Sequence, residues 1–120
     1  MVSESAAIDA AAFDELVAST GGEAAFIQEL IDTYLSDAPQ LFAQMRSALV
    51  AEDAETFRRA AHSLKSNSAS LGALTLSALA KDLEIMGKAA NLEGAAAKIT
   101  TADAEYARVK AALELKRPAL

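Results

Sequence analysis

The chain has 120 residues, the size of one ordinary domain and too short for two independently stable cores. Hydrophobic residues make up 52% and charged residues 23%, a balance typical of globular proteins. The absence of cysteine excludes disulfides, zinc–thiolate sites and thiol catalysis, and the net charge of −6 argues against nucleic acid as the main partner. We expect one domain over residues 1–120, with its core at about 8–115 and flexible tails at 1–7 and 116–120.

The sequence shows no sign of membrane attachment or export. No uninterrupted apolar stretch approaches the roughly 18 to 20 residues of a membrane helix. Residues 1–7 lack the basic region followed by an apolar region that marks a signal peptide. We therefore expect a cytoplasmic protein. Met1 and the short tails favour a free-standing chain, and a domain cut from a larger protein stays open as the alternative.

Composition and apolar spacing both predict helices. Thirty alanines, a quarter of the chain, stand against two prolines and five glycines, which favours few, long helices. The apolar residues recur at helical spacing throughout, and no segment alternates with a period of two. The expected fold is all-α: an antiparallel up-and-down four-helix bundle with a short additional N-terminal helix.

The first two helices have clear boundary signals. A short helix begins after Asp9, a good N-cap residue, and ends at Gly21 and Gly22. A long helix follows from about 23 to 50, and Pro39 is expected to kink it without reversing the chain, because the apolar phase continues. Its expected inner stripe is Ile27, Leu30, Tyr34, Ala38, Leu41, Met45 and Leu49.

Three more helices complete the expected bundle. Glu52 and Asp53 mark a new helix start, and Gly72 closes that helix. A fourth helix runs into a break at about 87–94, and the last helix ends before Pro118. The inner stripes are Phe57, Ala61, Leu64, Ser68 and Leu71, then Leu76, Leu79, Leu83 and Met86, and finally Ile99, Ala102, Tyr106, Val109 and Leu113.

The single histidine, His62, falls outside the buried stripe of the third main helix. Its neighbours within one helical turn are Arg58, Arg59, Lys65 and Ser66. The segment 56–81 holds four basic residues and no acidic one, so it carries +4 while the rest of the chain carries −10. The sequence thus predicts a local positive field around the histidine of an acidic protein.

Phosphoryl chemistry suits this arrangement. A neutral imidazole is a competent nucleophile at cellular pH. Lys65, one turn away, is placed to offset the charge of a phosphoryl group on His62, and the small residues Ser66 and Ala69 leave room for a large partner. The plainer interpretation is a solvated helix face with an incidental histidine.

Other chemistries fit less well. No acidic residue lies within six residues of His62 on its own helix, and Glu84 on the next helix comes without a nucleophile elbow, so a serine triad is disfavoured. One histidine among basic residues repels cations, which argues against a metal site. No nucleotide-binding motif is present, so the chain is not expected to bind ATP.

The stretch His62-Ser63-Leu64-Lys65-Ser66-Asn67-Ser68-Ala69-Ser70-Leu71-Gly72 resembles the signature of histidine-containing phosphotransfer (HPt) domains. The likeness extends to the proline-bearing long helix, the acidic turn before the histidine helix and the Leu83-Glu84 pair, over roughly residues 8–115. One departure is Ser66, where many family members have glycine.

The resemblance implies a role for several residues. His62 would accept the phosphoryl group, Lys65 would stabilise its oxygens, and Gly72 would avoid a side chain near the site. Ser66 is still small, and its hydroxyl would reach the phosphoryl group and help Lys65 to stabilise it, while Ala69 would allow close approach. Glu84 and Lys88 would face the histidine from the next helix, although a surface ion pair between them explains both equally well.

The resemblance further implies a phosphoryl carrier rather than an enzyme. It would take the group from the aspartate of one response-regulator receiver domain, downstream of a hybrid sensor histidine kinase, and pass it to another receiver. The receiver would supply Mg²⁺, so no cofactor or metal is expected here. Arg58 and Arg59 would form a basic docking patch for the acidic receiver site, and the carrier is expected to be a monomer.

Two alternatives stay open. A helical adaptor would bind signalling partners without chemistry. A histidine kinase dimerisation domain would have an acidic residue directly after the histidine, where this chain has Ser63. Ile8, Ala12 and Leu74 are candidates either for the core or for the docking surface, which the sequence leaves unassigned.

Overall fold

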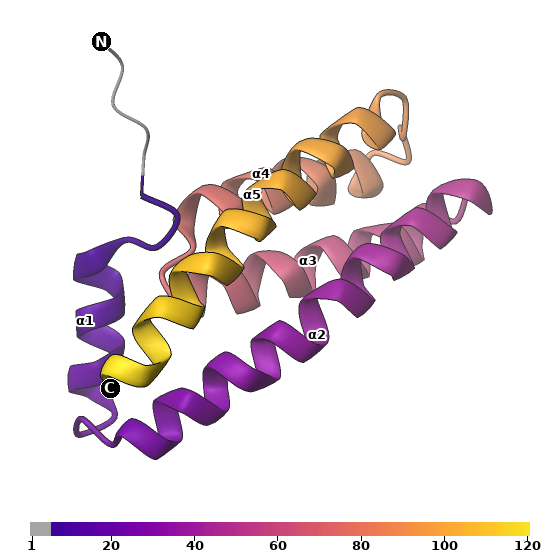
Figure 1. Ribbon diagram of the computed structural model, residues 1–120. Coiled ribbons are helices and arrows are strands. Elements are labelled where there is room, and N and C mark those ends of the chain that lie inside the picture. The colour runs from indigo at the N-terminus through magenta and orange to yellow at the C-terminus, as the bar shows by residue number, and fades with distance from the viewer. Residues whose placement is uncertain (1–5) are drawn as a thin grey trace, which may run out of the picture.

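A computed structural model describes residues 6–120 as an all-helical domain, with no strand in that range (Figure 1). A 3₁₀ turn follows the last of five α-helices. The elements are α1 (Ala10–Ser19), α2 (Ala24–Val50), α3 (Ala54–Ser70), α4 (Leu74–Lys88), α5 (Ala95–Lys116) and η1 (Arg117–Ala119). The expected all-α class and the expected order of elements are confirmed.

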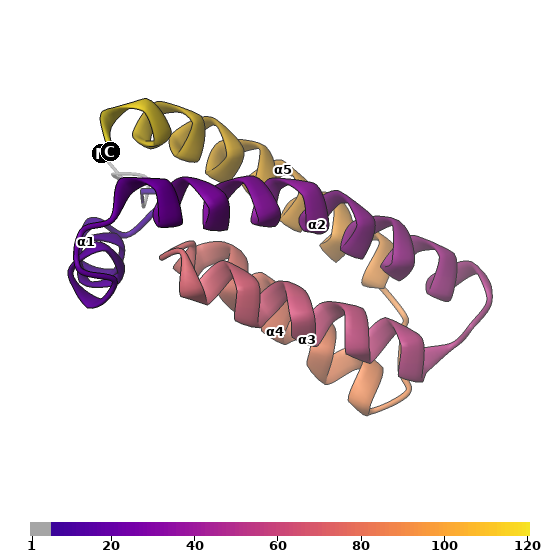
Figure 2. The ribbon, with the colours of Figure 1, turned by 90° about the horizontal axis from the view of Figure 1, so that it is seen from below.

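The four long helices form an up-and-down bundle. Each packs against its neighbours in the chain, α2 with α3, α3 with α4 and α4 with α5, and α5 closes the ring against α2. Figure 2 shows α2 and α5 on one side and α3 and α4 on the other, with α1 across one end. The short connections between these helices explain the antiparallel order.

Helix boundaries follow the local chemistry of the sequence. The Asp9 carboxylate accepts a hydrogen bond from the Ala12 N–H at 2.9 Å, and the Asp53 carboxylate accepts one from the Thr56 N–H at 3.1 Å. These bonds satisfy amide groups that have no partner within the first helical turn. Asp9 and Asp53 therefore fix the starts of α1 and α3, as predicted.

The long helix α2 continues through Pro39 without a chain reversal, as the apolar phase predicted. Its buried face is rotated slightly from the expected stripe. Leu30, Leu41 and Leu49 are only partly buried and flank the core. The most buried positions of α2 are Ile27, Ile31, Tyr34, Ala38, Phe42, Met45 and Ala48.

The core lies along the bundle axis. Every residue of the stripes expected for α3 and α5 is buried. In α4 the stripe shifts, because Leu79 and Met86 are partly buried while Ala80 and Gly87 take the inner positions. Gly87 therefore lies inside α4, which ends at Lys88, and the expected break begins only afterwards.

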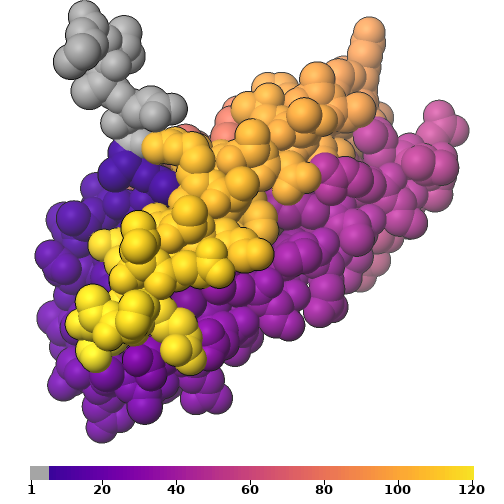
Figure 3. All heavy atoms as spheres, viewed as in Figure 1, coloured from indigo at the N-terminus to yellow at the C-terminus, as the bar shows by residue number. Residues whose placement is uncertain are grey.

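The ends of the chain differ from the expected tails. Most of the expected N-terminal tail, residues 1–5, lies outside the described residues, and Ala7 is buried against the core. At the other end, Arg117 donates two hydrogen bonds of 2.8 Å to Asp32 of α2, so this segment is packed. Figure 3 shows the C-terminal segment lying over α1 and the start of α2.

None of the helices within residues 6–120 combines the length and apolarity needed to cross a membrane.

Candidate functional site

His62, Lys65 and Glu84 form one cluster on the surface between α3 and α4. His62 Nδ1 lies 2.7 Å from Glu84 Oε2, and Lys65 Nζ lies 2.6 Å from Glu84 Oε1. The His62 side chain is 54% exposed, whereas Glu84 is only 13% exposed. The two oxygens of one half-covered carboxylate thus hold both the histidine and the lysine, and leave the other edge of the imidazole ring toward solvent.

Close packing of α3 against α4 brings these residues together. A methyl group on Gly87 would lie 2.9 Å from the backbone N and Cα of Arg58, so glycine is the residue that allows this approach. The Ser77 hydroxyl donates a 2.9 Å hydrogen bond to the Lys65 carbonyl oxygen. Gly87 and Ser77 fix α4 against α3 on either side of Glu84, so its carboxylate reaches His62.

The carboxylate of Glu84 is the electrostatic centre of the cluster. The hydrogen bond from Lys65 lowers the pKa of Glu84, partial burial opposes this shift, and the hydrogen bond from His62 lowers it further. Glu84 is therefore ionised at neutral pH and carries no proton to donate. The proton of the 2.7 Å contact lies on His62 Nδ1, and in the neutral ring Nε2 holds the free lone pair.

The positive field expected from the sequence is weaker in the structure. Arg58 donates hydrogen bonds of 3.0 and 2.6 Å to Glu55, and Arg59 Nε lies 3.7 Å from the same carboxylate. Glu55 and Glu84 lie just outside the acid-free segment 56–81 in sequence, and in the structure both carboxylates contact its basic residues. The net charge of that segment overestimated the field, because it did not include these two neighbours.

The small residues lie on the exposed side of α3. Ser66 and Ala69 follow His62 by one and two helical turns, and both are exposed. Lys88 is exposed at the last position of α4 and makes no ion pair with Glu84 within residues 6–120. The alternative of a Glu84–Lys88 surface pair is therefore wrong, because Glu84 pairs with Lys65.

Gly72 serves a different purpose from the one that the resemblance implied. It lies ten residues after His62, about 15 Å further along the chain at the rise of a helix. Its φ of +82° favours glycine, and an added Cβ would meet Asp9 O at 3.2 Å and Phe13 N at 3.3 Å. The Asp9 N–H also donates a 2.8 Å hydrogen bond to Gly72 O. Gly72 therefore follows the end of α3 and allows α1 to pack closely against this turn. The space that its missing side chain provides is occupied by the start of α1.

The candidates for a docking surface separate into two groups. Ile8 is buried in the core at 4% exposure, Ala12 is partly buried, and Leu74 is 48% exposed.

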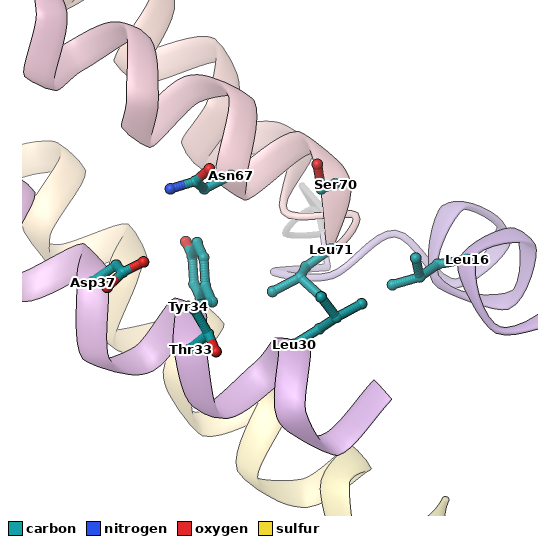
Figure 4. A pocket seen from close by; sticks show the side chains of 8 residues that line it. All are labelled: Leu16, Leu30, Thr33, Tyr34, Asp37, Asn67, Ser70 and Leu71. Atoms are coloured by element: carbon teal, nitrogen blue, oxygen red, sulfur yellow. The ribbon is translucent and has the colours of Figure 1, made fainter. Parts of the chain in front are cut away.

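A hollow of about 200 Å³ lies between α1, α2 and α3 (Figure 4). None of His62, Lys65 and Glu84 lines it. It is lined by Leu16, Leu30, Thr33, Tyr34, Asp37, Asn67, Ser70 and Leu71.

Tyr34 forms the inner wall of this hollow. Its hydroxyl makes a buried 2.9 Å hydrogen bond with Ser68 Oγ, and burial raises the pKa of Tyr34 to about 12. The hydroxyl therefore stays protonated and satisfies Ser68, which has no exposure to water. The Tyr34–Ser68 hydrogen bond thus links α2 to α3.

Within residues 6–120 no group of three or more His, Asp or Glu side chains is arranged to hold a metal ion.

Sequence reasoning missed Gly87, Ser77 and Glu55. Gly87 had a visible signal, because it lies four residues after Leu83 on the inner stripe, where glycine is unfavourable unless packing requires it. Glu55 also had a signal, because it stands three and four residues before Arg58 and Arg59 on an expected helix. Ser77 had none, since its partner is settled only when α3 and α4 pack.

Comparisons with known proteins agree with this architecture. A family model described as "Hpt domain" matches residues 29–112. The structure is similar to the crystal structure of histidine-containing phosphotransfer protein B (HptB) from Pseudomonas aeruginosa PAO1, with a TM-score of 0.88 and 27% sequence identity. The match covers 98% of this chain and 99% of that one. None of the curated protein sequences matches the chain significantly.

Proposed function

Because the chain belongs to the Hpt domain family, whose members carry phosphoryl groups on histidine in phosphorelays, we propose that His62 is its phosphoryl acceptor. His62 is the only histidine in the sequence, and its ring is 54% exposed. Hpt proteins are carriers, and this chain acts stoichiometrically in the same way. The observation that carries the proposal is the exposed imidazole edge beside a carboxylate that occupies Nδ1.

The atom that accepts the phosphoryl group is Nε2. Glu84 holds Nδ1 as the protonated nitrogen, so the lone pair of the neutral ring is on Nε2, at the edge that Glu84 does not cover. The ring also needs no rotation to present Nε2. This preorganisation lowers the entropy that must be lost when a large partner aligns its phosphoryl group with the ring.

Lys65 supplies positive charge close to His62. Its side chain is 29% exposed, and the residue lies one helical turn from His62. A phosphoryl group on Nε2 brings nearly two negative charges and three acceptor oxygens, which Lys65 is placed to neutralise and to hydrogen-bond. The hydroxyl of Ser66, on the same exposed side, is a second donor.

The partners are response-regulator receiver domains and the hybrid sensor kinase that precedes them. The receiver supplies the aspartate and Mg²⁺, and this chain supplies the histidine. Arg59, which is 68% exposed and only weakly engaged by Glu55, is the most available basic residue for contact with an acidic receiver site. The protein works as a monomer, since its four long helices already enclose one core.

Transfer from phosphorylated receivers tests this proposal. Receiver domains phosphorylated with a small-molecule donor are mixed with the wild type or with His62→Gln, and protein-bound phosphate is followed over time. We expect labelling of the wild type alone, with phosphate that is labile in acid and stable in base, as a phosphoramidate is. Lys65→Ala should label at least about tenfold more slowly, because it removes one charge-assisted hydrogen bond.

Two results would contradict the assignment. Labelling of His62→Gln as strongly as the wild type would place the phosphate elsewhere. If no receiver labels either protein, including receivers encoded nearby, the Hpt fold would stand without the carrier role and the adaptor alternative would lead.

A further inference from the structure

We propose that the charge of Glu84 keeps the proton on Nδ1 after His62 has been phosphorylated, and so keeps the carrier ready to donate. This inference rests on the proposed function and concerns the second half of the relay. It makes Glu84 a positioning residue that acts through His62 and does not touch the phosphoryl group.

The first transfer leaves a positive charge on the ring. The P–O bond of the aspartyl phosphate breaks with its electron pair going to the aspartate, and the Nε2 lone pair of His62 forms the N–P bond. The ring began neutral with a proton on Nδ1, so it is now an imidazolium that carries a phosphoryl group. Glu84 Oε2, 2.7 Å from Nδ1, lies where this positive charge is stabilised.

The second transfer needs that same proton. When the N–P bond breaks, its electron pair returns to Nε2, and the departing ring is neutral only if Nδ1 still carries its proton. If the proton has been lost, the leaving group is an imidazolate anion, which is a far poorer one. With Glu84 holding the proton, both transfers proceed without any proton entering or leaving the site.

The surroundings support this role for Glu84. Its side chain is only 13% exposed, so water screens the interaction of the carboxylate with Nδ1 less than at an open surface. Lys65 binds the opposite oxygen and keeps the carboxylate ionised and oriented. Other charged groups lie on the elements packed around the ring, and one of them, Arg58, also interacts electrostatically with the Glu84 carboxylate. They are Arg58 and Arg59 on α3, paired with Glu55, Lys81 and Lys88 on the exposed side of α4, and Asp37 of α2 in the groove beside Ser63.

Glu84→Gln separates charge from geometry. The amide oxygen still accepts a hydrogen bond from Nδ1–H, and the negative charge is removed. The amide nitrogen, which is a donor, replaces the oxygen that binds Lys65, so the hydrogen bond to His62 is kept and the ion pair with Lys65 is lost. Glu84→Ala removes both. Each protein is phosphorylated chemically with phosphoramidate, which needs no receiver, and the loss of phosphate is then measured from pH 5.5 to 9 with and without an unphosphorylated receiver.

We expect Glu84→Gln to lose phosphate at the wild-type rate at pH 5.5, where both phosphorylated rings are protonated. At pH 8 it should retain phosphate about three- to tenfold longer, because without the carboxylate charge the Nδ1 proton of the phosphorylated ring is held less strongly. A ¹⁵N spectrum of the phosphorylated wild-type ring should show Nδ1 still protonated at pH 8, a readout that requires no variant.

Superimposable pH profiles for wild type and Glu84→Gln would overturn the inference, as would a deprotonated Nδ1 at pH 8 in the wild type. If Glu84→Gln fails to fold, the nitrogen spectrum of the wild type decides. Failure of the proposed function looks different: phosphoramidate would label His62, the pH profiles would still be measurable, and no receiver would exchange phosphate with either protein.

Discussion

Replacing Gly87 with alanine tests whether the α3–α4 contact is set by packing or by helix propensity. Propensity alone predicts stabilisation, because alanine in a helix is favoured over glycine by roughly 0.5–1 kcal/mol. The structure predicts the reverse. The new methyl group would lie 2.9 Å from Arg58 N, Cα and Cβ, and two of these are backbone atoms that cannot turn away.

Overpacking of this kind costs about 1–3 kcal/mol. Because all three contacts are at 2.9 Å and two involve backbone atoms, the upper half of this range applies, about 2–3 kcal/mol. After subtraction of the propensity gain, Gly87→Ala should destabilise the domain by about 1–2.5 kcal/mol and lower the melting temperature by about 4–10 °C. Urea unfolding followed by far-ultraviolet circular dichroism measures the difference. The matched control is Ser47→Ala at an exposed position of α2, which should change stability by no more than about 0.5 kcal/mol. A Gly87→Ala protein as stable as the wild type would refute the packing argument.

Three further predictions follow from the described contacts. Gly72→Ala should cost about 1–3 kcal/mol, because alanine is strained at φ +82° and crowds α1, while chemical phosphorylation of His62 by phosphoramidate keeps its wild-type rate. Ser68→Ala should cost about 1–3 kcal/mol in urea unfolding, because the buried Tyr34 hydroxyl loses its partner; a neutral effect would mean that water replaces it. The pKa of Glu84 is lowered by folding, so its contribution is complete above about pH 4.5 and is lost as the pH falls below that value. The stability difference between wild type and Glu84→Gln should therefore shrink between pH 5 and 3, and a constant difference would contradict the ion pair.

The sequence by itself determined the helices and their order. Alanine content and apolar spacing are local properties, and the caps at Asp9 and Asp53 act within one helical turn, so no tertiary information was needed. The position of His62 outside the buried stripe also followed from helical geometry alone. The same local rule predicted which of its neighbours, Lys65 among them, lie one turn away.

Only the tertiary structure decided what those neighbours do. Glu84 is 22 residues from His62 in sequence, and the choice between pairing with Lys88 or with Lys65 depended on how closely α4 approaches α3. That approach depends in turn on Gly87, whose missing side chain matters only against the backbone of Arg58. Charge counted along the chain overestimated the field at His62, because electrostatic energy depends on distance in space. Glu55 pairs with Arg58 and Arg59 within α3, and the packing of α4 on α3 adds the carboxylate of Glu84.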